Sequence, residues 1–168
     1  MLFRSAMESV GGMEPERALK VAAALESESE HPIARAIRSK AEEESLDVPA
    51  VGDFSALEGR GVRAKVDGAT WHLGGPALLS ELGPALPQTL TDFRGPQESR
   101  ARTVVFLLEG DDPVAAFSVA DGLREESASA VNGLREAGLR VVMLTGDSRE
   151  AAEAVAEELG IDRVLSEV

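Results

Sequence analysis

Residues 26–33 bring several carboxylates and an imidazole to a point where two predicted helices meet. Apolar residues fall at helical spacing on both sides of this segment, and Ser29 is the expected cap of the second helix. The chain therefore turns at His31, which places the imidazole near Glu26 or Glu30. A flat ring beside a carboxylate can stack on a nucleobase and accept a hydrogen bond from its exocyclic amine. The alternative is a solvated turn with ordinary surface charges.

Two glycine pairs could let a ligand approach the backbone closely. Gly59 and Gly61 flank an arginine, and Gly74-Gly75 follows a predicted strand. The first pair lacks the third glycine and the following helix of a dinucleotide fingerprint, so it is not a Rossmann signature. A bulge or a turn would explain the first pair equally well, and the second pair could expose backbone N–H groups to an anion or simply end a hairpin.

The third candidate is Thr145-Gly146-Asp147, after the apolar segment of residues 140–144. We expect this segment to be a buried parallel strand, and ligands of open α/β sheets bind at the carboxyl ends of such strands. A threonine hydroxyl and the N–H groups of the next helix can hold a phosphoryl oxygen, while an aspartate can engage a cation or position a water. A simple helix cap is the alternative. Asp121-Gly122 also follows a strand and could be a turn.

The elements that position these residues follow from the periodicity of the chain. Strand patterns alternate around Asp67-Gly68, a two-residue hairpin turn, and residues 83–102 predict a loop with one helical stretch. The predicted fold class is α/β: an antiparallel sheet with a helix pair, then an incomplete parallel α/β portion. The expected helices are residues 14–27, 32–45, 76–82, 125–137 and 149–159, and the expected strands are residues 51–57, 62–66, 69–73, 103–108, 114–119, 140–144 and 161–165.

Composition excludes several classes of function. The formal net charge of −13 at pH 7 argues against nucleic acid and against an anionic membrane surface. The absence of cysteine excludes disulfides and cysteine-based zinc sites, and two histidines are too few for a His-rich metal site, so no metal ligands are expected. No apolar run is long enough to span a bilayer, and we expect a soluble, intracellular chain.

Taken in order, the motifs resemble those of a P-type cation-transporting ATPase, and Ser29-Glu30-His31-Pro32 resembles the heavy-metal-transporting branch. The resemblance covers nearly the whole chain. Any one motif is weak, whereas the ordered set is specific. The motifs that carry it are Glu26 with Ser29-Glu30-His31-Pro32, then Gly59-Arg60-Gly61-Val62, Gly74-Gly75, Asp121-Gly122-Leu123-Arg124 and Thr145-Gly146-Asp147.

The resemblance implies a nucleotide site in the first part of the chain. It implies that Glu26 contacts the amine of adenine and that His31 orients the ring or stacks on it. The family usually has asparagine where this chain has Gly75, so a side-chain contact to the phosphates is lost there. The remaining residues that the resemblance places along the nucleotide are Gly59, Gly61, Val62 and Gly74.

The resemblance also implies that Thr145, Gly146 and Asp147 support the transferred phosphoryl group and that Asp121 lies at a hinge. The family's acceptor aspartate belongs to an Asp-Lys-Thr-Gly-Thr run, which this sequence does not contain. We therefore expect a fragment, inactive alone, made of a nucleotide-binding domain at residues 1–118 and part of a phosphorylation domain at residues 119–168. Phosphoryl transfer in the parent would use ATP and Mg²⁺.

The expected partners are ATP, ADP and the other domains of the parent: its actuator, membrane and remaining phosphorylation parts, with this chain on the cytoplasmic side. Residues 119–168 could self-associate, because an unpaired apolar strand edge invites pairing. Two other interpretations stay open: a haloacid dehalogenase-like phosphatase, and a non-catalytic nucleotide-binding or interaction module. The sequence does not specify a transported ion.

Overall fold

The computed structural model describes residues 5–100, 102–119, 125–146 and 149–166. The chain divides into two compact units, Phe3–Ala120 and a second that holds Asp121–Val168. We refer to them as the larger unit and the smaller unit. The predicted hinge residue Asp121 and the predicted phosphoryl-supporting residue Asp147 both lie outside the described residues.

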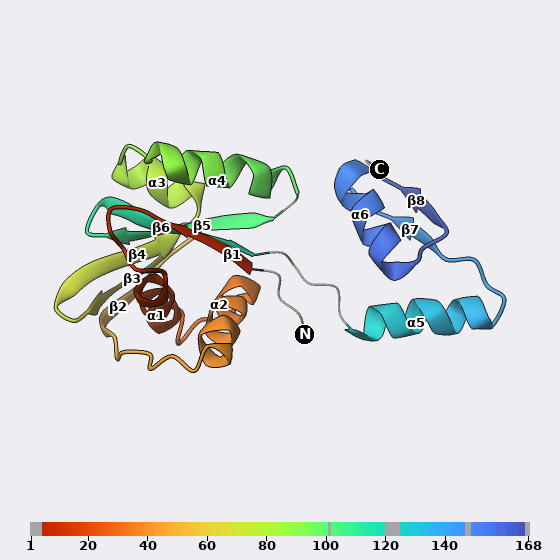
Figure 1. The fold of residues 1–168 in the computed structure, drawn as a ribbon, viewed down its shortest axis with the longest axis horizontal. Helices are drawn as coiled ribbons and strands as arrows, with labels where there is room; N and C mark the ends of the chain where they lie inside the picture. The colour runs from red at the N-terminus through yellow and green to blue at the C-terminus, as the bar shows by residue number, and fades with distance from the viewer. Residues whose placement is uncertain (1–4, 101, 120–124, 147–148, 167–168) are drawn as a thin grey trace. The chain divides into compact units, whose positions relative to one another are not determined.

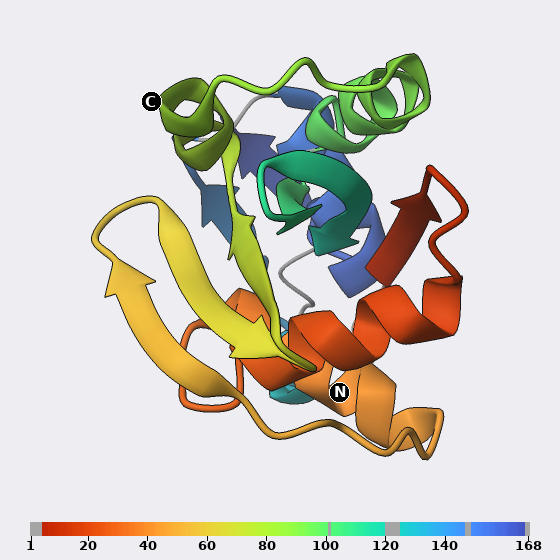
Figure 2. The same ribbon diagram turned by 90° about the vertical axis from the view of Figure 1, so that its left-hand side faces the viewer.

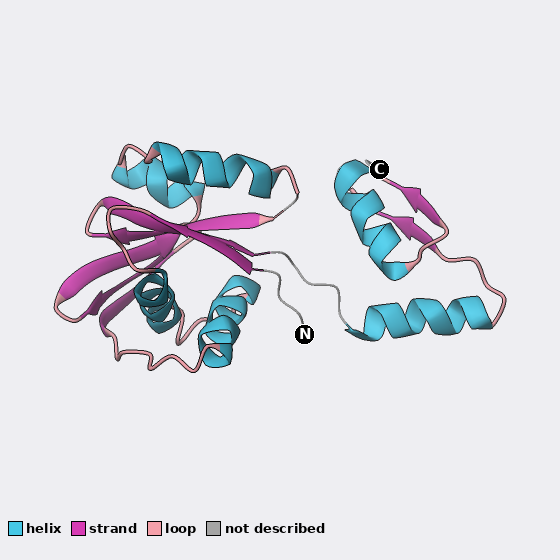
Figure 3. Cartoon of the chain, in the orientation of Figure 1, coloured by secondary structure: helices cyan, strands magenta, loops and turns pink. Residues whose placement is uncertain are grey.

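The larger unit is built on one antiparallel sheet (Figures 1 and 3). Its strands are β1 (Ser5–Ser9), β2 (Gly52–Leu57), β3 (Gly61–Val66), β4 (Ala69–Gly74), β5 (Thr103–Glu109) and β6 (Asp112–Val119). They lie in the order β1-β6-β5-β4-β3-β2, and every neighbouring pair is antiparallel. The predicted antiparallel sheet is thus confirmed, and β5 and β4 are its central strands.

Helices cover both faces of this sheet (Figures 1 and 2). One face carries α1 (Pro15–Leu25) and α2 (Pro32–Glu43), and the other carries α3 (Pro76–Leu82) and α4 (Gln88–Glu98). Alternate side chains of β5 enter the two cores: Val105 and Leu107 pack under the first helix pair, and Val104 and Phe106 under the second. Both faces of this strand are therefore buried, as its continuous apolar sequence requires.

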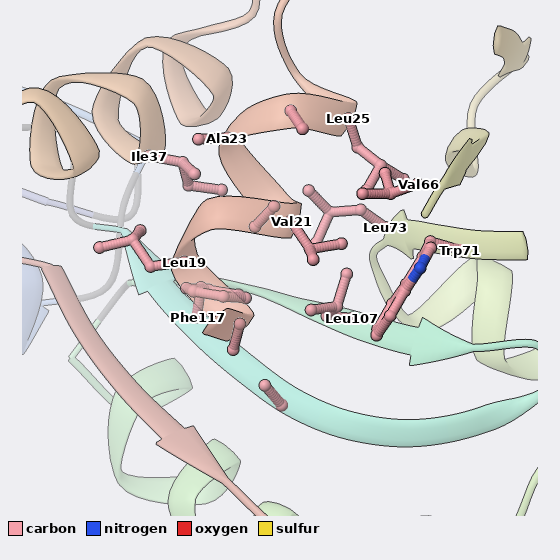
Figure 4. Packing of buried hydrophobic residues seen from close by; sticks show 14 of the residues in the cluster. Leu19, Val21, Ala23, Leu25, Ile37, Val66, Trp71, Leu73, Leu107 and Phe117 are labelled. Atoms are coloured by element: carbon pink, nitrogen blue, oxygen red, sulfur yellow. The ribbon is translucent and has the colours of Figure 1, made fainter. Parts of the chain in front are cut away.

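The core beneath α1 and α2 is the larger of the two (Figure 4). Trp71 is 1% exposed and belongs to a cluster of apolar side chains from α1, α2 and strands β3 to β6. The labelled members are Leu19, Val21, Ala23, Leu25, Ile37, Val66, Trp71, Leu73, Leu107 and Phe117. This packing attaches the end of α1 firmly to the sheet.

Local sequence explains where the predicted elements begin and turn. Pro15 and Pro32 occupy the first turns of α1 and α2, where the missing N–H has no helical partner to lose. Asp67 and Gly68 have φ values of 51° and 82°, which is the left-handed geometry of a two-residue hairpin turn. Both helix starts and the hairpin are confirmed.

One strand was missed and one predicted helical stretch is now defined. Strand β1 was not predicted; it pairs with β6, more than a hundred positions away in the chain, with Ser5 opposite Val119. The helical stretch predicted within residues 83–102 is the eleven-residue helix α4, which continues despite Pro96 near its end. Leu90 is fully buried and Phe93 packs beside it in the second core, so tertiary contact stabilises a helix that composition disfavours.

The smaller unit contains α5 (Glu125–Glu136), β7 (Val142–Leu144), α6 (Arg149–Leu159) and β8 (Arg163–Leu165). The two strands form a parallel pair. Gly138 has a φ of 77° just after α5, as expected for a residue that ends a helix. No helix in the described ranges is long and apolar enough to cross a membrane.

Candidate functional site

The corner between α1 and α2, residues 26–31, holds the first group of predicted site residues. The cap of α2 is His31, whose Nδ1 accepts a hydrogen bond from the N–H of Ile33 at 3.3 Å. The prediction of Ser29 as the cap is wrong. Its hydroxyl oxygen instead accepts the N–H of His31 at 3.4 Å. His31 takes the capping role because Pro32 is the first residue of the helix, so the cap position falls on the residue directly before it.

Glu26 caps the carboxyl end of α1 and is only 9% exposed. Burial raises the pKa of its carboxyl group above the ordinary value of 4.5. A hydrogen bond from the Ser29 side chain and electrostatic interactions with His31 and Arg38 oppose that rise. The result is a largely desolvated acceptor whose partners all belong to the same corner.

His31 contributes an exposed ring to this corner. Because Nδ1 accepts a hydrogen bond, the neutral ring carries its proton on Nε2. The capping bond fixes the ring against the start of α2 while its faces stay open to solvent. An exposed flat ring and a buried carboxyl group therefore belong to the same turn, and such a pair can stack on a base and accept from its amine.

The glycines form a second group, at the joint between β3 and β4. Gly61 and Gly74 are directly opposite one another. A Cβ at Gly61, whose φ is 143°, would overlap the carbonyl oxygen of Leu73 and lie 2.6 Å from the Cα of Gly74. A Cβ at Gly74 would overlap the carbonyl oxygen of Arg60. These two glycines are thus required by the approach of one strand to the other.

The other predicted nucleotide residues differ in their surroundings. Gly59 has a φ of 70° and open space around it, and Gly75 precedes α3 with a φ of −84°, also in open space. The side chain of Val62 is buried in the first core, so only its backbone could face a ligand. Arg60, between the first two glycines, forms an ion pair with Glu81 of α3.

One structural path joins the corner to the glycines. Leu25, next to Glu26, packs in the same core as Val62 and Val66 of β3, the strand that begins at Gly61. No hydrogen bond or ion pair among the described residues joins the corner directly to Gly61 or Gly74. The two groups therefore share a rigid support without touching.

The predicted phosphoryl-supporting residues lie in the smaller unit. Thr145 and Gly146 follow β7, and the N–H of Thr145 donates to the carbonyl oxygen of Leu165 at 3.0 Å. The prediction that β7 is buried is wrong: Val142 and Leu144 are 51% and 67% exposed. Within the described residues β7 pairs with β8 alone, so neither strand has a neighbouring strand on both edges, as a buried parallel strand normally has.

Arg38 is the residue at the corner that the sequence did not single out. Its Nη1 donates to the backbone carbonyl oxygens of Glu26 and of Ser29, the latter at 2.6 Å. The available signal was an arginine in the middle of α2, on the helix that follows a helix end with unpaired carbonyls. Nothing in the spacing alone distinguishes it from the exposed Arg35.

Comparisons with known proteins agree with this architecture. The family model for haloacid dehalogenase-like hydrolases matches residues 4–168. A probable copper-exporting P-type ATPase V of Mycobacterium tuberculosis is 41% identical over 155 residues, which are 92% of this chain and 20% of that protein. The chain thus spans about a fifth of the length of the curated relatives it matches.

Solved structures give the same picture. A zinc-transporting PIB-type ATPase aligns with 99% of this chain and 26% of its own, at a TM-score of 0.79 and 30% identity. The N-domain of HMA8, a copper-transporting P-type ATPase, aligns with 68% of this chain and 97% of its own, at a TM-score of 0.56 and 28% identity. The chain belongs to the haloacid dehalogenase-like hydrolase family, and it matches the part of heavy-metal P-type ATPases that includes the nucleotide-binding domain.

Proposed function

We propose that the larger unit binds an adenine nucleotide at the α1–α2 corner, with the base between His31 and Glu26. The observation that carries the proposal is the pairing of an exposed, capping imidazole with a buried carboxyl group on one turn. The ring offers a stacking face, and base–aromatic stacking contributes about 1–3 kcal/mol. The carboxyl group can accept from the exocyclic amine, which adenine has and guanine lacks at the same position.

The phosphates would extend toward the glycines. Gly59 and Gly75 lie in open space, so their backbone can be approached by a ligand. Gly61, Gly74 and the backbone of Val62 complete this side of the proposed site, and the tight packing of Gly61 against Gly74 makes it rigid. In the parent protein the γ-phosphoryl group would pass to an aspartate that this sequence does not contain.

The smaller unit would support that transfer as part of a phosphorylation domain. Thr145, Gly146 and Asp147 would face the transferred phosphoryl group, and Asp121 would lie at the hinge that closes the larger unit over it. The parent is proposed to be a heavy-metal transporter that holds this chain on the cytoplasmic side of a membrane. Among the described residues no three His, Asp or Glu side chains are grouped to hold a metal ion, so a Mg²⁺ site is not assigned to them.

The test is a calorimetric titration of the whole chain with ATP, ADP and GTP. The informative variant is His31→Asn, because asparagine is a preferred helix cap and keeps the start of α2 while removing the ring. We expect adenine nucleotides to bind in preference to GTP, and the variant to bind ATP roughly tenfold more weakly at unchanged stability. The matched control is Glu30→Gln, which removes an exposed carboxylate from the same corner and should leave affinity unchanged.

Two outcomes would contradict the proposal. A chain without preference for adenine nucleotides would leave His31 as a cap only. A His31→Asn variant that binds ATP as tightly as the wild type would place the base elsewhere. Phosphatase turnover by the chain alone would favour the general hydrolase chemistry of the family over a nucleotide-binding role.

A further inference from the structure

Arg38 connects the second helix to the turn that carries the proposed base-binding residues. The two protons of its Nη1 are shared between the carbonyl oxygens of Glu26 and Ser29, one at each side of the turn. Helical side chains lean toward the helix N-terminus, which aims this arginine back at the corner from nearly two turns along α2. The guanidinium thus bridges the two ends of a segment without regular secondary structure.

The contacts of Arg38 supply a hydrogen-bond donor to the carboxyl end of α1. The last carbonyl groups of a helix have no partner within that helix. At Glu26 the carbonyl oxygen accepts the N–H of Ser29 at 3.1 Å and also the Arg38 guanidinium. A cation at the C-terminal end of a helix also interacts favourably with the helix dipole. Arg38 therefore acts as a cap for α1 that is supplied by α2.

The charge of Arg38 acts on the Glu26 side chain as well as on its backbone. The groups that face this carboxyl are Ser29, His31 and Arg38, and all three favour its ionised form against burial. Hydrogen bonds with a charged donor are roughly twice as strong as neutral ones, and a partly buried position screens them little. Arg38 thus sets both the backbone conformation of the turn and the electrostatic environment of the Glu26 carboxyl group.

We infer that Arg38 is a positioning residue for the adenine pocket: by holding the carbonyls of Glu26 and Ser29 together, it sets the distance between the Glu26 carboxyl and the His31 ring. This inference rests on the function proposed above. Stacking and hydrogen bonding to one base demand a fixed separation between ring and acceptor. Without the contacts of Arg38 to this turn, the protein would lose its preference for adenine nucleotides while it stayed folded.

The experiment compares Arg38→Met, Arg38→Lys and Arg35→Met in the whole chain. Methionine keeps the apolar stem but removes charge and donors, while lysine keeps a charged donor and should rescue in part. Arg35 is exposed on the same helix and, in the part of the chain that the structure describes, its side chain makes no hydrogen bond or ion pair, so Arg35→Met is the matched control.

We expect Arg38→Met to weaken ATP binding about tenfold and to reduce the preference of ATP over GTP, with Arg38→Lys intermediate and Arg35→Met unchanged. In the free protein, the NMR signals of the His31 ring and of the Ile33 N–H should shift in Arg38→Met only. Thermal unfolding measured in parallel separates lost positioning from lost fold, because simple destabilisation would not change the ATP-to-GTP ratio.

The outcomes separate this inference from the proposed function. A wild-type chain that binds ATP, together with an Arg38→Met variant of equal affinity and selectivity, overturns the role of Arg38 and leaves the proposed site intact. A wild-type chain that binds no adenine nucleotide overturns both. Loss of affinity in Arg35→Met to the same extent would also overturn the inference, because a general charge effect would then explain the data.

Discussion

The carboxyl group of Glu26 is buried, and the removal of water raises its pKa above 4.5. In the folded chain the ionised carboxylate is therefore less favourable than in the unfolded chain. The same ionised group is the acceptor that the proposed base contact uses. Residues at functional sites often lower the stability of the fold in this way, because the ionised group that binding requires is unfavourable in a buried position.

The pH dependence of stability follows from this direction of shift. Below the ordinary pKa of 4.5 the Glu26 carboxyl is protonated in both the folded and the unfolded chain, so it does not lower the free energy of unfolding. As pH rises through the raised folded-state pKa, the carboxyl ionises in its buried site and the free energy of unfolding falls. We therefore expect Glu26→Gln to be more stable than the wild type near neutral pH, by a margin that shrinks as pH falls to 4.5 and below. Urea unfolding at both pH values checks this.

The same variant should bind ATP more weakly than the wild type at neutral pH. A Glu26→Gln protein that is less stable than the wild type at neutral pH would mean that the contacts of Ser29, His31 and Arg38 outweigh burial. The control Glu30→Gln, at an exposed position, should leave stability unchanged at both pH values.

Among the elements, the joint between β3 and β4 is the most constrained. The strands approach so closely that neither Gly61 nor Gly74 has room for a side chain. The proposed phosphate side of the site is thus built on a backbone contact and not on side chains. A short strand pair held in this way presents its N–H and carbonyl groups in one geometry.

Replacing Gly61 with alanine should therefore destabilise the larger unit. The Cβ would overlap backbone atoms of β4, and a φ of 143° is strained for any residue with a side chain, so we expect a loss of roughly 3 kcal/mol. A lower midpoint of urea unfolding, with an unchanged dependence of the unfolding free energy on urea concentration, would show this loss of stability. Gly75→Ala, at an ordinary φ and in open space, should cost less than about 1 kcal/mol, and equal losses in the two variants would contradict this explanation.

At the scale of the whole molecule, the two units differ in how much apolar surface they bury. The larger unit has a cluster on each face of a six-stranded sheet. In the smaller unit Leu139, Val142, Leu144 and Leu165 are 39–67% exposed, and each strand has three residues. A two-stranded sheet is marginal on its own, so most of the stability of the chain should reside in the larger unit.

We expect hydrogen exchange to show this difference directly. Amides of α5, β7 and β8 should exchange much faster in a dilute sample than those of α1, α2 and β5. At higher concentration, protection in β7 and β8 should rise if copies pair through these strands, and Leu144→Lys should prevent that rise. Equal protection of the two units in a dilute monomer would contradict the expectation.

Local chemistry in the sequence was sufficient for much of this protein. The prolines at the starts of α1 and α2, the Asp67-Gly68 turn and Gly138 after α5 determine element boundaries, because each restricts the backbone within a few residues. Alternating apolar residues determined which faces of the strands are buried. The ordered motifs were enough to indicate the family, since each motif needs only its own neighbours in the chain.

Only the tertiary structure decided the rest, because those features depend on partners far away in sequence. The pairing of β1 with β6 and the bounds of α4 within residues 83–102 rest on contacts that no local pattern contains. Arg38 binds carbonyl oxygens twelve and nine positions earlier in the chain, across the corner, whereas the His31 cap is a local contact to Ile33 that the sequence analysis assigned to the wrong residue. Gly61 and Gly74 could be understood only when their strands lay side by side, because the space that excludes a side chain belongs to the opposite strand.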